Sequence, residues 1–85
     1  MNIAQDGFEE IDKESEYVNN MRDAIDNNDK DSLIGWYNGF ISEFAVGDAQ
    51  TAIALKNELL REHSIHHNHE MQNVVKNLKV PTYLV

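Results

Sequence analysis

The chain of 85 residues has no cysteine and a single proline, Pro81. Without cysteine it can form neither disulfide bonds nor zinc sites with thiolate ligands, two devices that often stabilise a domain of this size. It has no run of about 18 apolar residues, the length that a membrane-spanning helix requires. Its first ten residues also lack the basic-then-apolar pattern of a secretion signal. We therefore expect a cytoplasmic protein in which residues 1–85 form a single domain around one small core.

Basic residues are scarce: 7 lysines and arginines stand against 15 aspartates and glutamates, for a formal net charge of −8. The imbalance is concentrated in residues 1–31, where ten acidic and three basic residues give a balance of −7. Residues 32–85 have five acidic and four basic residues, a balance of −1. Direct binding of nucleic acid is disfavoured, because phosphates need a basic surface to release their counterions. An acidic surface suits a partner protein with a basic surface instead.

The most apolar stretch of the sequence is SLIGWYNGFISEFAV, residues 32–46, which carries one charged residue, Glu43. It contains four of the seven aromatic residues, namely Trp36, Tyr37, Phe40 and Phe44. A helix that is apolar on more than one face has to be covered by its neighbours. We therefore expect an all-α domain of three to four helices that packs around this central helix and shelters Trp36 and the other aromatics.

Two glycines in this stretch, Gly35 and Gly39, lie four residues apart and so stack one turn apart on a helix. Each costs the helix roughly 1 kcal/mol relative to alanine. Their presence predicts that another backbone or a large side chain comes close to the central helix at these two positions.

Before the central helix, apolar residues recur at steps of three, four or their multiples, which is typical of an amphipathic helix. The series comprises Phe8, Ile11, Val18, Met21 and Ile25. It follows residues 1–7, which we expect to be loose. Four acidic residues share a narrow sector opposite this stripe: Glu9, Asp12, Glu16 and Asp23. We call them the acidic face, and we expect it to meet the basic surface of a partner.

Turn-forming residues mark both ends of the central helix. Residues 27–31, NNDKD, favour local side-chain hydrogen bonds and left-handed backbone conformations. Either Asp31 or Ser32 is placed to cap the central helix. After it, Gly47 suits the C′ position, and Asp48 suits the N-cap of the next helix.

The chain after the second turn allows two interpretations. Either the helix breaks near Ser64–Asn68 and a short last helix folds back, or one helix runs from Ala49 to Lys79 over about 45 Å. The apolar positions stay in phase, which favours the long C-terminal helix. Its overhang then predicts a homodimer or a complex with another chain. Residues 80–85, VPTYLV, are too apolar for a solvated tail, and we expect them to dock on the core or on a partner.

All four histidines lie within residues 63–69. His63 and His67 are four apart, a helical spacing that lets two imidazoles reach one metal ion, with Glu70 as a further ligand. In a dimer seam the same histidines would act as a pH switch, since protonation places charge in the interface as the pH falls to about 5. There is no HExxH or similar motif. A metal- or pH-responsive regulator is therefore the alternative interpretation, and we expect no cofactor.

No nucleophile elbow, phosphate loop or other catalytic motif is present, so we do not expect an enzyme. The small, acidic, cysteine-free helical chain resembles the accessory and inhibitor proteins, some of them phage-encoded, that bind and modulate a larger protein. The resemblance implies a protein-interaction module, with mimicry of DNA by the acidic face as a subtype. Besides the acidic face, the predicted contact residues are those of the last helix: His63, His67, Met71 and Val74.

Overall fold

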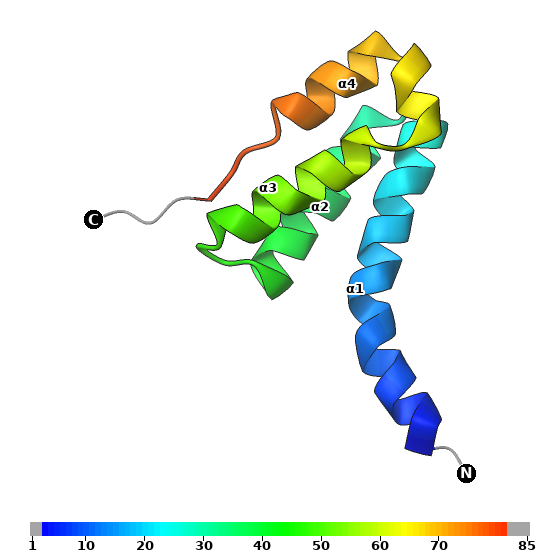
Figure 1. The fold of residues 1–85 in the computed structure, drawn as a ribbon, viewed down its shortest axis with the longest axis vertical. Coiled ribbons are helices and arrows are strands. Elements are labelled where there is room, and N and C mark those ends of the chain that lie inside the picture. The colour runs from blue at the N-terminus through cyan, green and yellow to red at the C-terminus, as the bar shows by residue number, and fades with distance from the viewer. Residues whose placement is uncertain (1–2, 82–85) are drawn as a thin grey trace.

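The computed structural model describes the backbone of residues 3–81 and the side chains of residues 13–81. Its elements are α1 (Ile3–Asp26), α2 (Lys30–Phe44), α3 (Ala49–Leu60), the short 3₁₀ helix η1 (His63–His67) and α4 (His69–Lys76). α1 and α2 form an antiparallel hairpin, and α3 and α4 fold back on each other beside it (Figure 1). The predicted all-α domain is confirmed for residues 3–81, in which no strand forms. None of the described helices combines the length and the apolar character that a membrane span requires.

α1 is longer than the sequence pattern predicts. It begins at Ile3, so residues 3–7 are helical rather than loose, and its N-terminal half projects beyond the other helices (Figure 1). Extending an existing helix orders one residue for each new hydrogen bond, which is far less costly than starting a helix. The presence of Gly7 in this stretch, at roughly 1 kcal/mol, is therefore not enough to end α1.

The turn between α1 and α2 follows from the asparagines that end α1. Asn28 adopts a left-handed conformation, with φ of 56°. Its backbone N–H donates to the carbonyl of Ile25 at 3.1 Å, and the N–H of Asp29 donates to the carbonyl of Ala24 at 2.8 Å. This pair of bonds is the Schellman motif, which satisfies the free carbonyls at a helix end. The predicted left-handed turn is confirmed.

The cap of α2 is Asp29, and neither Asp31 nor Ser32 as predicted. The Asp29 carboxylate accepts hydrogen bonds from the backbone N–H of Ser32 at 3.2 Å and from its hydroxyl at 2.8 Å. The Schellman turn ends so early that the helix already starts at Lys30. Asp29 is therefore the residue in front of the helix, and Ser32 becomes the donor to the cap.

The turn between α2 and α3 uses the two residues that the sequence marks. Gly47 has the predicted positive φ, of 69°, although it lies one residue beyond C′ because the C-cap is Ala45. The N–H of Asp48 donates to the carbonyl of Ala45 at 3.0 Å and closes the turn. Asp48 then caps α3 as predicted, accepting from the N–H and the hydroxyl of Thr51 at 3.1 and 2.6 Å.

The chain reverses between α3 and α4, so the predicted continuous helix from Ala49 to Lys79 is wrong. α3 ends at Leu60, η1 follows, and α4 starts after Asn68. The Asn68 side chain caps α4 by accepting a hydrogen bond from the N–H of Met71 at 3.1 Å. The other interpretation, a break followed by a short helix that folds back, is the correct one, and the break begins directly after Leu60.

Burial of apolar side chains explains this reversal. Ile65, Met71 and Val75 are all fully buried within one chain, whereas a continuous helix would leave them on an overhang. Each such burial contributes about 1.5–3 kcal/mol. Carbonyls at the break find donors, since the backbone N–H groups of Arg61 and Glu62 donate to the carbonyls of Glu58 and Leu59, both at 3.1 Å. The Gln72 side-chain amide also donates to the carbonyl of Ile65 at 2.9 Å. The overhang on which the predicted homodimer rested is therefore missing.

The core draws side chains from every element. Its buried members are Met21, Ala24, Ile25, Leu33, Tyr37, Phe40, Ala45, Ala52, Leu55, Leu59, Ile65, Met71, Val75 and Leu78. The expectation that all the central aromatics are sheltered is wrong for Trp36, which keeps 39% of its surface exposed. Trp36 lies on the flank of α2 that faces α1, where the Tyr17 ring meets it edge-on with 5.5 Å between centroids.

Three hydrogen bonds from the side chains of Tyr37 and Lys56 attach the end of α4 and the segment after it to the rest of the fold. The Tyr37 hydroxyl donates to the carbonyl of Lys79 at 2.6 Å, and burial raises the pKa of this hydroxyl, which keeps it a donor. The Lys56 ammonium donates to the carbonyls of Lys76 and Leu78 at 3.0 and 2.7 Å. A cation here also suits the negative end of the α4 dipole. Val80 packs against the core, and residues 82–85 of the predicted docking tail lie outside the described residues.

The two glycines of α2 make a matched test of packing. A Cβ built on Gly39 would lie 3.0 Å from Cε2 of Tyr17, whereas a Cβ on Gly35 would meet nothing within 4 Å. The close approach predicted at both glycines is thus confirmed for Gly39 and wrong for Gly35. The Tyr17 ring is held between Trp36 and Phe44, so it has little room to move.

We therefore expect Gly35→Ala to stabilise the protein by about 0.5–1 kcal/mol, the usual gain at an open helical position. Gly39→Ala should gain less or be destabilising, because the same gain is offset by the collision with Tyr17. Urea denaturation of the two variants measures the difference. If both variants gain equally, the contact of Tyr17 with Gly39 is absent.

The two capping aspartates predict a dependence of stability on pH. Hydrogen bonds from the Ser32 hydroxyl and backbone lower the pKa of Asp29 below its ordinary 3.8, and those from Thr51 do the same for Asp48. A lowered pKa in the folded state stabilises the fold above pH 3.8, and this contribution is lost as the pH falls through the folded values. An Asp29→Asn, Asp48→Asn variant keeps both helix caps, but neither capping side chain can titrate. Its melting temperature should therefore fall less than that of wild type between pH 5 and pH 3, and an equal fall would contradict the assignment.

Candidate interaction surfaces

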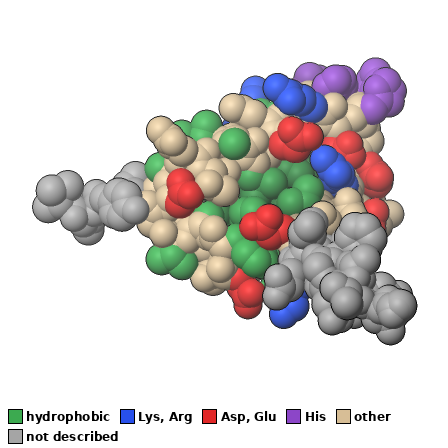
Figure 2. Space-filling model, turned by 60° about the horizontal axis from the view of Figure 1, so that its bottom comes forward, with side chains coloured by type: hydrophobic (Ala, Val, Ile, Leu, Met, Phe, Trp, Pro, Cys, Tyr) green, Lys and Arg blue, Asp and Glu red, His purple; other side chains and the backbone are tan. Residues whose placement is uncertain are grey.

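Two of the four residues of the acidic face have described side chains on α1. Glu16 and Asp23 are exposed on it as predicted, while the side chains of Glu9 and Asp12 lie outside the described residues. Figure 2 shows one view in which acidic side chains surround a central group of apolar ones, with the histidines gathered at one corner. The surface on this side of the molecule therefore combines negative charge with exposed apolar area.

Arg22 interrupts the negative charge between α1 and α3. Its guanidinium lies 3.3 Å from the carboxylate of Glu58 and 3.8 Å from that of Glu62. It borders a hollow of about 390 Å³ that also includes Val18 and Phe40. Exposed ion pairs of this kind contribute little, about 0–1 kcal/mol each. Their main effect is to neutralise part of the acidic surface at this position.

A larger hollow, of about 590 Å³, lies between α2 and α4. We call it the α2–α4 groove. Its lining residues are Lys30, Ile34, Asn38, Glu70, Asn73, Val74, Asn77, Leu78 and Lys79. Ile34 comes from α2 and Val74 from α4, while Leu78 follows α4, and together they give the groove an apolar floor. Of the predicted contact residues, Val74 lies here.

Polar side chains line the rest of the groove. Asn38 on α2 faces the same hollow as Asn73 and Asn77, which lie four apart at the end of α4. The charged residues are Lys30, Lys79 and Glu70, so the lining has a balance of +1 in a chain whose net charge is −8. The groove thus differs in both charge and polarity from the acidic face.

A third hollow, of about 470 Å³, adjoins the groove. It is lined by Tyr37, Asn38, Ile41, Ser42, Lys79, Val80 and Pro81. Asn38 and Lys79 line both hollows, so the two hollows are neighbours along α2. The α2 residues that line them, from Lys30 to Ser42, span about 18 Å of helix.

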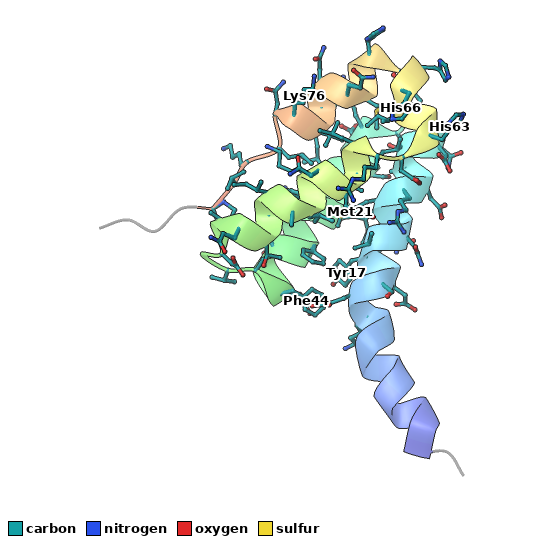
Figure 3. All side chains as sticks on the ribbon, in the orientation of Figure 1. Tyr17, Met21, Phe44, His63, His66 and Lys76 are labelled. Carbon is teal, nitrogen blue, oxygen red and sulfur yellow. The ribbon has the colours of Figure 1, made fainter. Side chains whose placement is uncertain are left out.

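The histidines of η1 lie close together on the surface. The ring centroid of His63 is 5.8 Å from that of His67 and 6.1 Å from that of His66, and all three are exposed. His63 and His66 extend away from the helices (Figure 3). Glu70, predicted as a further ligand, lines the α2–α4 groove. Residues 13–81 contain no group of three or more histidines and acids that could hold a metal ion.

Met71 was predicted to be an exposed contact residue, and this prediction is wrong. Its side chain is fully buried in the core. The prediction assumed a continuous helix, in which Met71 would stand on an uncovered stripe. Because the chain reverses, this stripe faces α3 instead.

Comparison of the chain with protein-family models, curated proteins and solved structures gives no match. The surfaces described above therefore have to be interpreted from their own residues.

Part of the groove has a signal in the sequence. Ile34 is an apolar residue on the most apolar stretch, and Asn73 and Asn77 are spaced to share one side of a helix. The position of Asn38 opposite them has no such signal, because it depends on how α4 folds back over α2. The same holds for Lys79, which the hydrogen bond from Tyr37 brings to the groove.

The contrasting burial of Met71 and Val74 can be tested directly. We expect Met71→Ala to destabilise the protein by about 2–5 kcal/mol, because it opens a cavity in the core. Val74→Ala should cost about 1 kcal/mol or less, since the groove leaves this side chain half open to water. Chemical denaturation gives both values. A small effect for both variants would mean that Met71 faces solvent.

Proposed function

We propose that this protein is a non-enzymatic interaction module, an accessory or inhibitor protein that binds and modulates another protein. The observation that supports this best is the α2–α4 groove, whose floor leaves apolar side chains open to solvent. Ile34 keeps 39% of its surface exposed there. A partner that covers the groove removes this surface from water, which is the main favourable contribution to protein association.

The acidic face has a different part in the proposal. Glu16 and Asp23 are exposed, and charges in such positions affect mainly how fast a partner is captured and in which orientation. The groove then determines how long the complex lasts. Mimicry of DNA is a subtype of this proposal, in which the acidic face competes for a basic channel of the partner.

The alternative, a metal- or pH-responsive regulator, has less support. The structure brings His63 near His67, but Glu70 lines the groove and does not join them. A pair of exposed imidazoles is a weaker metal site than one with three ligands. The interaction module therefore remains the leading proposal.

Capture experiments with single-residue variants test the proposed function. The wild-type chain, immobilised and incubated with lysate of the source organism, should retain a protein that the Ile34→Glu variant loses by more than about tenfold, because a charge in the groove opposes burial. Quantitative mass spectrometry of the retained proteins measures the loss. An Ile34→Glu variant that retains the same proteins at the same level would contradict the proposal.

Two further variants separate the surfaces. Ile53→Glu is a matched control, because Ile53 is 49% exposed but lies on α3, outside the groove lining. It should capture the partner like wild type. Glu16→Gln combined with Asp23→Asn should slow association at low salt and have little effect at high salt, where the charges are screened. Circular dichroism establishes that each variant is folded.

A further inference from the structure

The amides that line the α2–α4 groove define what it can hold. Asn38, Asn73 and Asn77 have exposed side chains. Within the part of the chain that the structure describes, their carboxamides make no hydrogen bond to the protein. Each carboxamide can donate and accept at the same time. Three of them, on both sides of an apolar floor, therefore offer paired donors and acceptors to a ligand.

The main chain of an extended peptide can bond to such groups, and the main chain of a helix cannot. The main-chain N–H and C=O groups of a helix are already bonded to each other. An extended segment presents an unpaired N–H and C=O at every residue, and these need partners when water is removed. Its side chains also alternate between its two faces, so every second one can enter an apolar floor. The α2 residues that line the two neighbouring hollows span about 18 Å, the length of five or six extended residues.

The charges of the groove add a second requirement. Lys30 lines the α2–α4 groove, and Lys79 lines both this groove and the neighbouring hollow. Both are exposed, and Glu70 is the acidic residue among the groove-lining side chains. A ligand with a carboxylate near either lysine is therefore favoured over a basic one.

We propose that the α2–α4 groove binds an extended segment of the partner protein, with apolar side chains at alternate positions and at least one acidic residue. The proposal rests on the proposed function and specifies the part of the partner that the groove recognises. The amides of Asn38, Asn73 and Asn77 bond to the main chain of this segment. Ile34 and Val74 hold its apolar side chains, and Lys30 or Lys79 pairs with its acid.

Selection from a phage-displayed library of random dodecapeptides on the 85-residue chain tests this assignment. Ile34→Glu serves for counter-selection, and Ile53→Glu serves as the matched control. Enriched peptides should show apolar residues with a period of two and carry an acidic residue. As synthetic peptides they should bind an Asn38→Ala, Asn73→Ala variant at least about tenfold more weakly than wild type. A Lys30→Ala, Lys79→Ala variant should also bind them more weakly and with less dependence on salt.

Several results would overturn the assignment. Apolar residues spaced by three and four would mean a helical ligand, and no enrichment that depends on Ile34 would mean that the groove takes no peptide. Peptide enrichment on a Tyr83→Ser, Leu84→Ser variant but not on the wild-type chain would make residues 82–85 the occupant. Self-association that Ile34→Glu abolishes would make it a second copy. Any of these outcomes leaves the proposed function standing if Ile34→Glu still loses the captured partner, so the two failures can be told apart.

Discussion

The burial of Ile65 is the contact on which the rest of this structure depends. Ile65 is the one aliphatic residue in the segment 61–70, and its side chain is fully buried although its neighbours His66 and His67 are exposed. A single apolar anchor in a polar segment fixes where the chain comes back to the core. The hydroxyl of Ser64 supports the same contact by donating to Asp26 of α1 at 2.5 Å. With the turn held in this way, α4 has to pack beside its own chain.

The groove and the buried end of α4 are consequences of that reversal. Folding α4 back places Met71 and Val75 in the core and leaves Val74 on the side that faces α2. The segment after α4 then runs along α2, where the Tyr37 hydroxyl donates to the carbonyl of Lys79, and the Lys56 ammonium of α3 donates to the carbonyl of Leu78. The two sides of the α2–α4 groove are therefore set by a core contact in η1. A change at Ile65 would alter the groove without touching its lining.

Local features of the fold could be predicted from the sequence, and the path of the last third could not. The central helix, the cap at Asp48 and the left-handed turn near Asn28 each depend on neighbouring residues, and each is present. The reversal depends instead on which of two packings of the same apolar stripe is more stable, the continuous helix or the folded-back one. Periodicity alone does not decide between them. Candidate site residues divide in the same way. Glu16 and Asp23 are exposed as their helix face implies, whereas Met71 was misplaced together with the helix that carries it.

The most direct test of this account is the distance between Ile53 and Lys79, both of them exposed, in the absence of any native cysteine. Spin labels on an Ile53→Cys, Lys79→Cys variant report it by double electron–electron resonance. The Lys56 ammonium bonds to the Leu78 carbonyl at 2.7 Å, so the folded-back chain predicts a label separation of about 25 Å or less. One continuous helix would separate the two positions by about 39 Å, and a measured distance of that size would contradict the reversal and remove the groove.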